Sequence, residues 1–492
     1  MPHRARRLRR VGLSRTLHGV SALITTRGRA PAGLLARCER AVRRARRSGG
    51  QVLVAVTVPV SPTVDPSAVA FASRREDEPW FCFEQPDHGG AALATLGCVK
   101  RLEGRGPRRF GQAAAAWREL AGAAEADAPD GPAGAGLVAV GGFAFADDGG
   151  EAPHWAGFEA ADLIVPEVAL ARRGADVRLT LAVLAAADDV PEELAARLEA
   201  RAGELRDTPL PLLDPAPAGR FRIASIAPPE HYEAAVARAV EQIRAGDFEK
   251  IVLAREVAVH APADHDAAAV FGVLRAAFGS CYVFCAGRGD AAFIAASPEL
   301  LVRREGLRAS TVALAGSTRR SADPAVDDHL GEQLLRSDKD REEQAIVTRR
   351  IARVLRPLSV WVAAPDEPAI VRVANIQHLA TPIRAQLTQP RSVVELAGAL
   401  HPTPAVGGEP DAIATPGIPA LEGLDRGWYA GAVGWTDANE DGEFCVALRC
   451  ALLRGREARL YAGAGVVRDS DPAAELAETE VKLGALLPIL AG

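Results

Sequence analysis

The hydrophobic and polar positions of this chain alternate between a helical period and a strand-like period. Short apolar runs such as VLVAVTVPV (residues 52–60) follow segments in which apolar residues recur every three or four positions. Clusters of glycine, proline and aspartate separate these segments, which is typical of α/β proteins. The apolar runs are much shorter than the roughly 20 residues that a membrane helix needs. The pattern therefore predicts a globular α/β protein without a membrane segment.

Four prolines within residues 206–222 indicate a long connection, and we place the main boundary there, near Gly219. The chain is thus divided into a leader (1–48), an N-terminal α/β half (49–218) and a second region (219–491). The first 47 residues hold fourteen arginines and one glutamate. We expect this basic leader to be poorly ordered, and no apolar segment follows its arginines as in a signal peptide. Because the net charge of the whole chain is −5, the remainder is acidic, which argues against nucleic-acid binding.

The second region begins with a predicted helix, a Gly-Asp stop at residues 246–247 and a buried strand that starts at Lys250. Residues 291–316 are expected to form a meander of three short strands. A helix is predicted over residues 337–358, a hairpin over residues 444–467, and a capped helix over residues 469–490. Seven cysteines without a CxxC spacing fit reduced thiols in the cytoplasm.

Lysine is scarce in this chain. Of 58 basic residues only four are lysines: Lys100, Lys250, Lys339 and Lys482. Lysine can lose its proton when it is desolvated, whereas arginine stays charged, so a retained lysine is a weak indication of chemistry. Lys250 is a candidate general base because it opens an apolar strand. Lys339 receives no role from the sequence.

Two acidic helices place carboxylates on one face, since residues three or four apart are neighbours there. The first pair is Asp340 and Glu343, and the second is Glu475 and Glu478, followed by Lys482. Facing helices of this kind would offer oxygen ligands to Mg²⁺. Spacing alone still favours solvated ion pairs, which contribute little.

Further polar residues stand in apolar or glycine-rich segments. Glu299 follows a proline inside FIAASPELLV, where desolvation would raise its pKa and suit a general acid, although pairing with a nearby arginine is the simpler interpretation. Arg449 lies in FCVALRCALL and needs an anionic partner if it is buried. The YAGAG turn, with Gly465, could bind an anion through backbone N–H groups. Tyr429 and His401 could add hydrogen bonds.

These segments follow one another in an order that resembles the chorismate-utilising enzymes, and most closely the isochorismate synthases. The resemblance covers residues 221–487 and rests on these motifs: FEKIVLAREV, FIAASPELLVRREG, LAGSTRR, SDKDREEQAIV, NIQHLATPI, LHPTPAVGG, DRGWYAGAVGW, FCVALRC, YAGAGVV and AELAETEVK. It implies a large multilayer α/β sandwich of two central sheets flanked by helices. It also implies chorismate as substrate and Mg²⁺ as cofactor.

The resemblance further implies a role for individual residues. Lys250 matches the base that activates water for attack at C2, and Glu299 matches the acid that protonates the departing C4 hydroxyl. Glu343 and Glu478 match the main magnesium ligands. The other matches are Asp340 and Glu475 beside the metal, and, at the substrate, Gly316, Ser317, His401, Tyr429, Arg449, Gly465 and Lys482.

The sequence departs from the family pattern at Gln344, where histidine is frequent, and at Ala313, where proline is frequent. Lysine at position 250 and the absence of an amidotransferase motif argue against anthranilate and aminodeoxychorismate synthases, which work with an amidotransferase partner. Salicylate synthase, which forms isochorismate and then eliminates pyruvate, is the nearer alternative; a binding protein on an inactive scaffold is the alternative of another class. We expect a monomeric cytoplasmic enzyme and leave open whether its product feeds menaquinone, a siderophore or salicylate.

Overall fold

Two large antiparallel sheets form the centre of the protein. The computed structural model describes residues 33–128, 130–215 and 217–492. The first sheet has 12 strands, in the order β1 (Val52–Pro59), β8 (Asp176–Ala185), β7 (Val168–Arg173), β3 (Ala91–Leu96), β2 (Trp80–Gln85), β11 (Tyr282–Arg288), β12 (Ala291–Ser297), β21 (Cys450–Arg454), β22 (Glu457–Val466), β10 (Lys250–His260) and β18 (Gly408–Glu409), with β9 (Arg222–Ser225) also on β10. The second has 10 strands, in the order β15 (Ser359–Ala363), β17 (Ile376–Leu387), β14 (Arg308–Arg319), β13 (Leu300–Glu305), β20 (Gly442–Val446), β19 (Ala432–Asp437), β5 (Val138–Phe143), β6 (Ala161–Val165) and β4 (Lys100–Glu103), with β16 (Ala369–Arg372) also on β17.

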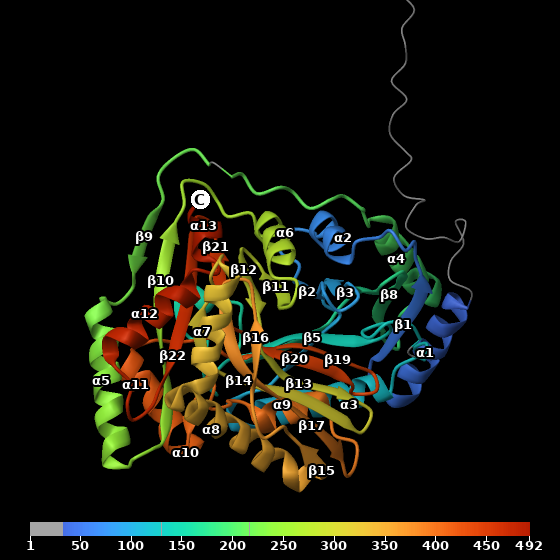
Figure 1. Cartoon of the computed structure of the whole chain (residues 1–492). Coiled ribbons are helices and arrows are strands. Elements are labelled where there is room, and N and C mark those ends of the chain that lie inside the picture. Colours follow the sequence, from blue (N-terminus) through green and yellow to red (C-terminus); the bar gives the residue numbers. More distant parts are fainter. Residues whose placement is uncertain (1–32, 129, 216) are drawn as a thin grey trace, which may run out of the picture.

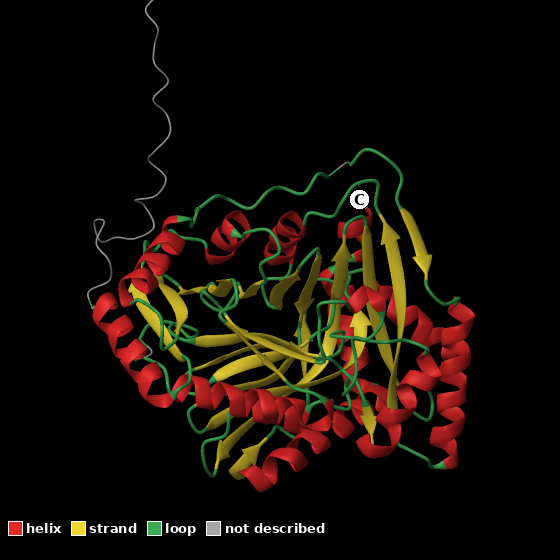
Figure 2. Cartoon of the chain, turned by 180° about the vertical axis from the view of Figure 1, so that it is seen from behind, coloured by secondary structure: helices red, strands yellow, loops and turns green. Residues whose placement is uncertain are grey.

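Helices lie around the outside of the sheets (Figures 1 and 2). The helices are α1 (Leu34–Ser48), α2 (Pro66–Ser73), α3 (Arg109–Gly122), α4 (Pro191–Gly203), α5 (Pro229–Ala245), α6 (Ala267–Ala277), α7 (Pro324–Arg336), α8 (Asp338–Leu355), α9 (Val393–Leu400), α10 (Asp411–Ala414), α11 (Ile418–Glu422), α12 (Pro472–Leu483) and α13 (Leu487–Ala491), with short turns η1 (Gly106–Arg108), η2 (Pro153–Trp155), η3 (Arg356–Leu358) and η4 (Thr415–Gly417). This is the two-sheet α/β architecture that the sequence predicts. Within the described ranges, no helix is long and apolar enough to span a membrane.

The regions before and after Gly219 contribute strands to both sheets. β2 pairs with β11 in the first sheet, and β5 pairs with β19 in the second. The proline-rich connection between α4 and β9 runs along one side of the molecule as a long loop (Figure 1). Side chains of both sheets also share one hydrophobic core, which includes Phe293 of β12 and Phe444 of β20. The residues on the two sides of Gly219 therefore do not form separate sheets, because strands from both sides pair with each other in each sheet.

Local signals in the second region act as expected, whereas some strand pairings differ. Helix α5 ends at Gly246, whose φ of 90° is the left-handed conformation that suits glycine at a helix end, and β10 starts at Lys250. The expected meander over residues 291–316 is wrong, because β12 belongs to the first sheet while β13 and β14 form a hairpin in the second. Likewise, β20 lies in the second sheet, and only β21 and β22 form the expected hairpin.

The leader is partly helical. Residues 1–32 lie outside the described part of the chain, but α1 packs on β1 and α4 through Leu34, Cys38 and Val42, which are buried. The expectation of poor order is therefore wrong for residues 34–48. The count of arginines hid the amphipathic pattern of this segment. The arginines of α1 occupy one face, and the small and apolar residues of the other face pack on the sheet.

Candidate active site

The chain crosses between the two sheets at two neighbouring points, and each crossing carries a candidate residue. Glu299 lies in the link from β12 to β13, and Arg449 lies in the link from β20 to β21. The links are joined by backbone hydrogen bonds, 3.0 Å from the N–H of Val446 to the carbonyl of Glu299 and 3.0 Å from the N–H of Ala296 to the carbonyl of Arg449. Arg449 has a φ of 49°, a strained conformation for this residue that the double crossing holds in place.

Glu299 is a carboxyl in a desolvated position. Its exposed fraction is 3%, and burial raises its pKa to about 8, although the charges of Lys250, Arg449 and Lys482 act in the opposite direction. Burial disfavours the carboxylate more than these cations favour it. Glu299 is therefore mainly protonated near neutral pH, as a general acid must be.

Lys250 is fully buried beside an acidic residue of α8. Its Nζ lies 2.8 Å from Oε1 of Glu343. Gly465 of β22 closes the other side, since a Cβ at this glycine would lie 2.1 Å from Glu343 Oε1 and 3.0 Å from Lys250 Cε. Only glycine leaves room for both side chains. The structure thus brings together three residues that the sequence singled out.

Helix α12 places a second acidic residue at the same site. Lys482 Nζ lies 2.8 Å from Glu478 Oε1, and the Ser317 hydroxyl donates a hydrogen bond of 2.7 Å to that oxygen. Burial would raise the pKa of Glu478, but Lys482 and Ser317 outweigh it and hold the pKa at about 2. Lys482 also donates to the carbonyl of Gly463, at 2.7 Å. Glu478 is therefore a persistent anion.

The remaining two predicted metal ligands complete a group of four acidic residues on α8 and α12. Lys339 Nζ lies 2.5 Å from Glu475 Oε1, and Glu475 is 1% exposed. Asp340 faces Gly316, whose φ is 69° and whose Cβ, if present, would lie 3.0 Å from Asp340 Cβ. Burial raises the pKa of both Asp340 and Glu475, and the negative charge of Glu478 adds to the effect. The structure thus shows what Lys339 contacts, which the sequence analysis left open: it forms an ion pair with Glu475.

Three of the four acidic residues are therefore each matched by a lysine. Among the described residues, no group of three or more His, Cys, Asp or Glu side chains is arranged to hold a metal ion. The donor chemistry nevertheless suits a hard divalent cation, because oxygen ligands from two facing helices share one small region. A cation at this place would compete with Lys250, Lys339 and Lys482 for the carboxylates.

His378 belongs to the site although the sequence analysis did not single it out. Arg449 Nη2 lies 3.2 Å from His378 Nε2, and His378 Nδ1 lies 3.2 Å from the carbonyl of Gly316. Burial, together with Arg449 and Lys482, lowers the pKa of His378 to about 3. The neutral ring accepts from Arg449 and donates to Gly316. The available signal was a histidine inside the apolar strand β17.

Two predicted substrate contacts differ in outcome. The Tyr429 ring stacks on Tyr461 with centroids 5.2 Å apart, and its hydroxyl lies 3.0 Å from the place of a Cβ on Gly463, so it borders the site. His401 is half-buried, and its ring packs between Phe110 and Phe145. Its Nε2 lies 2.9 Å from the carbonyl of Phe145, and burial lowers the pKa of the ring to about 3, so the ring is neutral. Its contact with the substrate stays a prediction.

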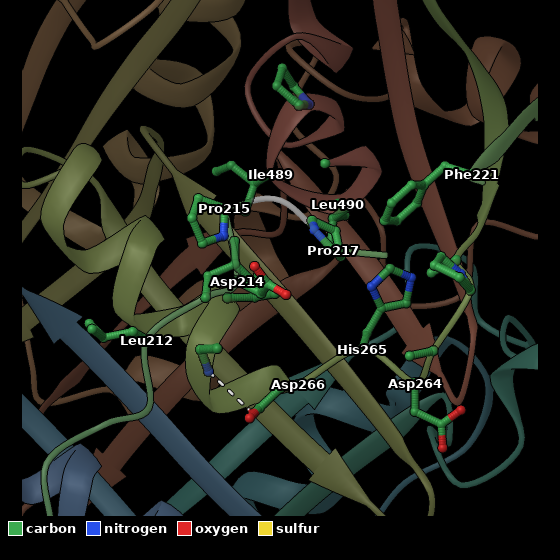
Figure 3. Close-up of a pocket in the computed structure, with 18 residues that line it drawn as sticks. Leu212, Asp214, Pro215, Pro217, Phe221, Asp264, His265, Asp266, Ile489 and Leu490 are labelled. Atoms are coloured by element: carbon green, nitrogen blue, oxygen red, sulfur yellow. Dashed lines mark hydrogen bonds between the residues drawn. The ribbon is translucent and has the colours of Figure 1, made fainter. Parts of the chain in front are cut away.

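A separate cavity lies at the opposite end of β10. Its volume is about 390 Å³, and it is lined by the proline-rich connection, α13 and the segment around His265 (Figure 3). Lys250 and Ala261 are separated by the whole of β10, roughly 36 Å at the usual rise of a strand. This cavity shares no lining residue with the group around Lys250.

Known proteins are similar to this chain over most of its length. The family model described as "Chorismate binding enzyme" matches residues 39–491. The salicylate biosynthesis isochorismate synthase of Pseudomonas aeruginosa is 38% identical over 91% of this chain and 92% of its own. The isochorismate synthase MenF of Bacillus subtilis is 33% identical over 73% and 75%. The structure of the menaquinone-specific isochorismate synthase MenF of Escherichia coli superimposes with a TM-score of 0.74, at 26% identity, over 92% of this chain and 100% of that one.

Proposed function

The chain belongs to the chorismate binding enzyme family, and from that premise we propose that it is a Mg²⁺-dependent isochorismate synthase acting on chorismate. The observation that carries the proposal is the pair Lys250 and Glu299. One is a buried amine and the other a buried carboxyl whose pKa of about 8 keeps it protonated. A base and an acid with different protonation states in one site are what an exchange of hydroxyl groups needs.

In the proposed reaction, water attacks C2 of chorismate and gives a proton to the neutral amine of Lys250. A new C2–O bond forms while the ring double bonds shift and the C4–O bond breaks. Glu299 donates its proton to the departing C4 oxygen, which leaves as water. Arg449, Lys482 and the amide at Gly465 are suited to bind the substrate carboxylates, and Tyr429 borders the ring position.

Glu343 and Glu478, with Asp340 and Glu475 beside them, would hold the Mg²⁺. Bound there, the ion would supply positive charge between these carboxylates and those of the substrate.

A salicylate synthase is the second candidate, because the name of the Pseudomonas aeruginosa relative combines salicylate biosynthesis with isochorismate synthase. The name of the Pseudomonas aeruginosa relative refers to salicylate biosynthesis, and the name of the Escherichia coli enzyme refers to menaquinone. The two names thus give two fates for isochorismate. We propose that this chain stops at isochorismate. It is proposed to act as a single chain, without an amidotransferase subunit.

The test is product analysis by liquid chromatography and NMR after incubation of the protein with chorismate, with and without Mg²⁺. The proposal expects isochorismate as the main product, and no turnover when EDTA removes the metal. Salicylate as the main product would favour the second candidate. Anthranilate formed with added ammonia, or turnover unaffected by EDTA, would contradict the proposal.

A further inference from the structure

One edge of β10 is only partly covered by neighbouring strands. The other edge pairs with β22 along ten residues, from Ile251 to His260. On the outer edge, β18 covers only Lys250 and Ile251, and β9 covers only Val257–His260. Each strand is extended by one backbone hydrogen bond, from the N–H of Val252 to the carbonyl of Gly407 at 2.7 Å and from the N–H of Ile226 to the carbonyl of Glu256 at 3.1 Å. Between them, residues 253–255 have no described backbone segment paired with this edge. An edge of this kind leaves backbone groups that need other partners.

Two side chains take the place of the missing strand. Glu422, at the end of α11, accepts a hydrogen bond of 2.6 Å from the N–H of Ala254. Arg426 donates a hydrogen bond of 2.9 Å from Nη2 to the carbonyl of Val252. The two also bind each other, with Arg426 Nε 3.0 Å from Glu422 Oε2 and Nη2 2.5 Å from Oε1. Their side chains are 2% and 1% exposed, so this ion pair is part of the interior.

Arg426 also reaches the other walls of the site. Its Nη1 donates a hydrogen bond of 2.8 Å to the carbonyl of Val406, in the loop that leads into β18. Its guanidinium lies 4.2 Å from the centroid of the Phe145 ring and 5.7 Å from that of Tyr429. One planar, permanently charged group thus contacts β10, the loop before β18 and the ring of Tyr429 at the same time. A lysine could not make these contacts together.

We propose that Glu422 and Arg426 form a positioning pair that substitutes for a strand and fixes the end of β10 that carries Lys250. The proposal rests on the proposed function, in which Lys250 is the base. Val252, which Arg426 holds, faces Gly465 across the sheet, and Gly465 is the residue packed against Lys250. A shift of β10 at Val252 would therefore displace the amine from the attacking water. Misplacement by about 1 Å can lower a rate by about 100-fold.

The test compares Arg426→Lys with Arg288→Lys as a matched control. Arg288 is also a buried arginine that binds a carboxylate, Asp162, at 2.7 Å and a backbone carbonyl, that of Gly287, at 2.9 Å. It lies in β11, away from Lys250. Glu422→Gln is the milder second variant, because the amide oxygen can still accept from Ala254 while the charge is lost.

We expect Arg426→Lys to lower kcat by about tenfold or more, with KM within about threefold of the parent value, because positioning of the base affects the chemical step. Glu422→Gln should lower kcat in the same direction, again with little change in KM. Arg288→Lys should lower Tm by a similar amount and leave kcat within about threefold of the parent value. An Arg426→Lys enzyme with the parent kcat, or a loss of kcat that Arg288→Lys reproduces, would overturn the proposal.

Hydrogen exchange of the backbone amides separates this proposal from the proposed function. Arg426→Lys should speed exchange at residues 251–254 by about tenfold or more relative to Arg288→Lys, since local opening depends on the contacts that hold the edge. If the parent does not convert chorismate, the proposed function fails and the exchange experiment still decides whether the pair holds β10. Unchanged exchange at residues 251–254 would contradict the positioning role even in an active enzyme. If Arg426→Lys does not fold, Glu422→Gln is carried through both measurements.

Discussion

Replacing Glu299 with glutamine removes the proton that this residue is proposed to donate and leaves the side-chain shape almost unchanged. Burial raises the pKa of Glu299 from an ordinary 4.5 to about 8. At pH 7, a carboxyl with a pKa of about 8 is protonated in roughly nine molecules out of ten, against roughly one in 300 for a pKa of 4.5. The fold thus raises the fraction of usable acid by about 300-fold.

A positioned general acid typically contributes about 10² to 10⁴ in rate, so Glu299→Gln should lower kcat by at least about 10². Only the protonated form of Glu299 can donate a proton. The parent should therefore keep its activity up to about pH 8 and lose it as the pH rises further and Glu299 loses its proton. Arg449 opposes this rise in pKa, so Arg449→Met should move the alkaline limb to higher pH. The assay is kcat/KM from about pH 6 to about pH 10, with circular dichroism to verify folding.

Glu84→Gln is the matched control. Glu84 is also a buried glutamate, with 2% exposure and a pKa raised by burial, but it lies in β2 and binds Ser67 and Arg275. Its replacement should affect stability and leave the alkaline limb unchanged. The acid role of Glu299 would be refuted if Glu299→Gln retained kcat/KM within about threefold of the parent, since a general acid contributes far more. A parent profile whose alkaline limb began near pH 6 instead of near pH 8 would refute it equally.

Three other predictions concern the same site. Lys250→Arg should lower kcat/KM by about 10² or more, because arginine cannot act as the base. Lys100→Arg, at the exposed start of β4, is the control and should change kcat/KM little. A Lys250→Arg enzyme with the activity of the parent would contradict the base role. Glu343→Gln and Glu478→Gln should each raise the Mg²⁺ concentration needed for half-maximal activity, and parent-like titrations by calorimetry and by rate would show that neither binds metal. Gly465→Ala should remove activity while the protein stays folded by circular dichroism, since its Cβ would lie 2.1 Å from Glu343 Oε1; normal turnover would show that this wall of the site can move.

Local sequence signals predicted the elements that carry the site. Gly246 ends α5 through its backbone N–H, and the side chains of Ser337 and Asp471 accept hydrogen bonds from the first turns of α8 and α12, so these starts and stops followed from neighbouring residues. The helix expected over residues 469–490 is wrong at its end, because α12 stops at Leu483 and α13 begins at Leu487. The spacing of the acidic residues also placed them correctly on helix faces. These features depend on a few residues along the chain, which is why a sequence reveals them.

Features that depend on distant parts of the chain were not predictable in this way. Periodicity shows that β12, β13 and β20 are strands, but it does not show that the chain changes sheet at Glu299 and again at Arg449. The contact between Lys339 and Glu475 joins residues 136 positions apart. His401 and His378 were equally plausible from composition, and only the packing shows that His401 lies against Phe145 and His378 against Arg449.

Labelled water tests the central claim most directly. If Lys250 activates water for attack at C2, chorismate converted in H₂¹⁸O should give isochorismate with one ¹⁸O atom at the C2 hydroxyl, as mass spectrometry and the ¹⁸O shift of the C2 carbon signal in NMR would show. Lys250→Arg should form this labelled product at a rate lower by about 10² or more. Isochorismate without the label would mean that the hydroxyl group moves within the substrate, and the account of Lys250 and Glu299 would be contradicted.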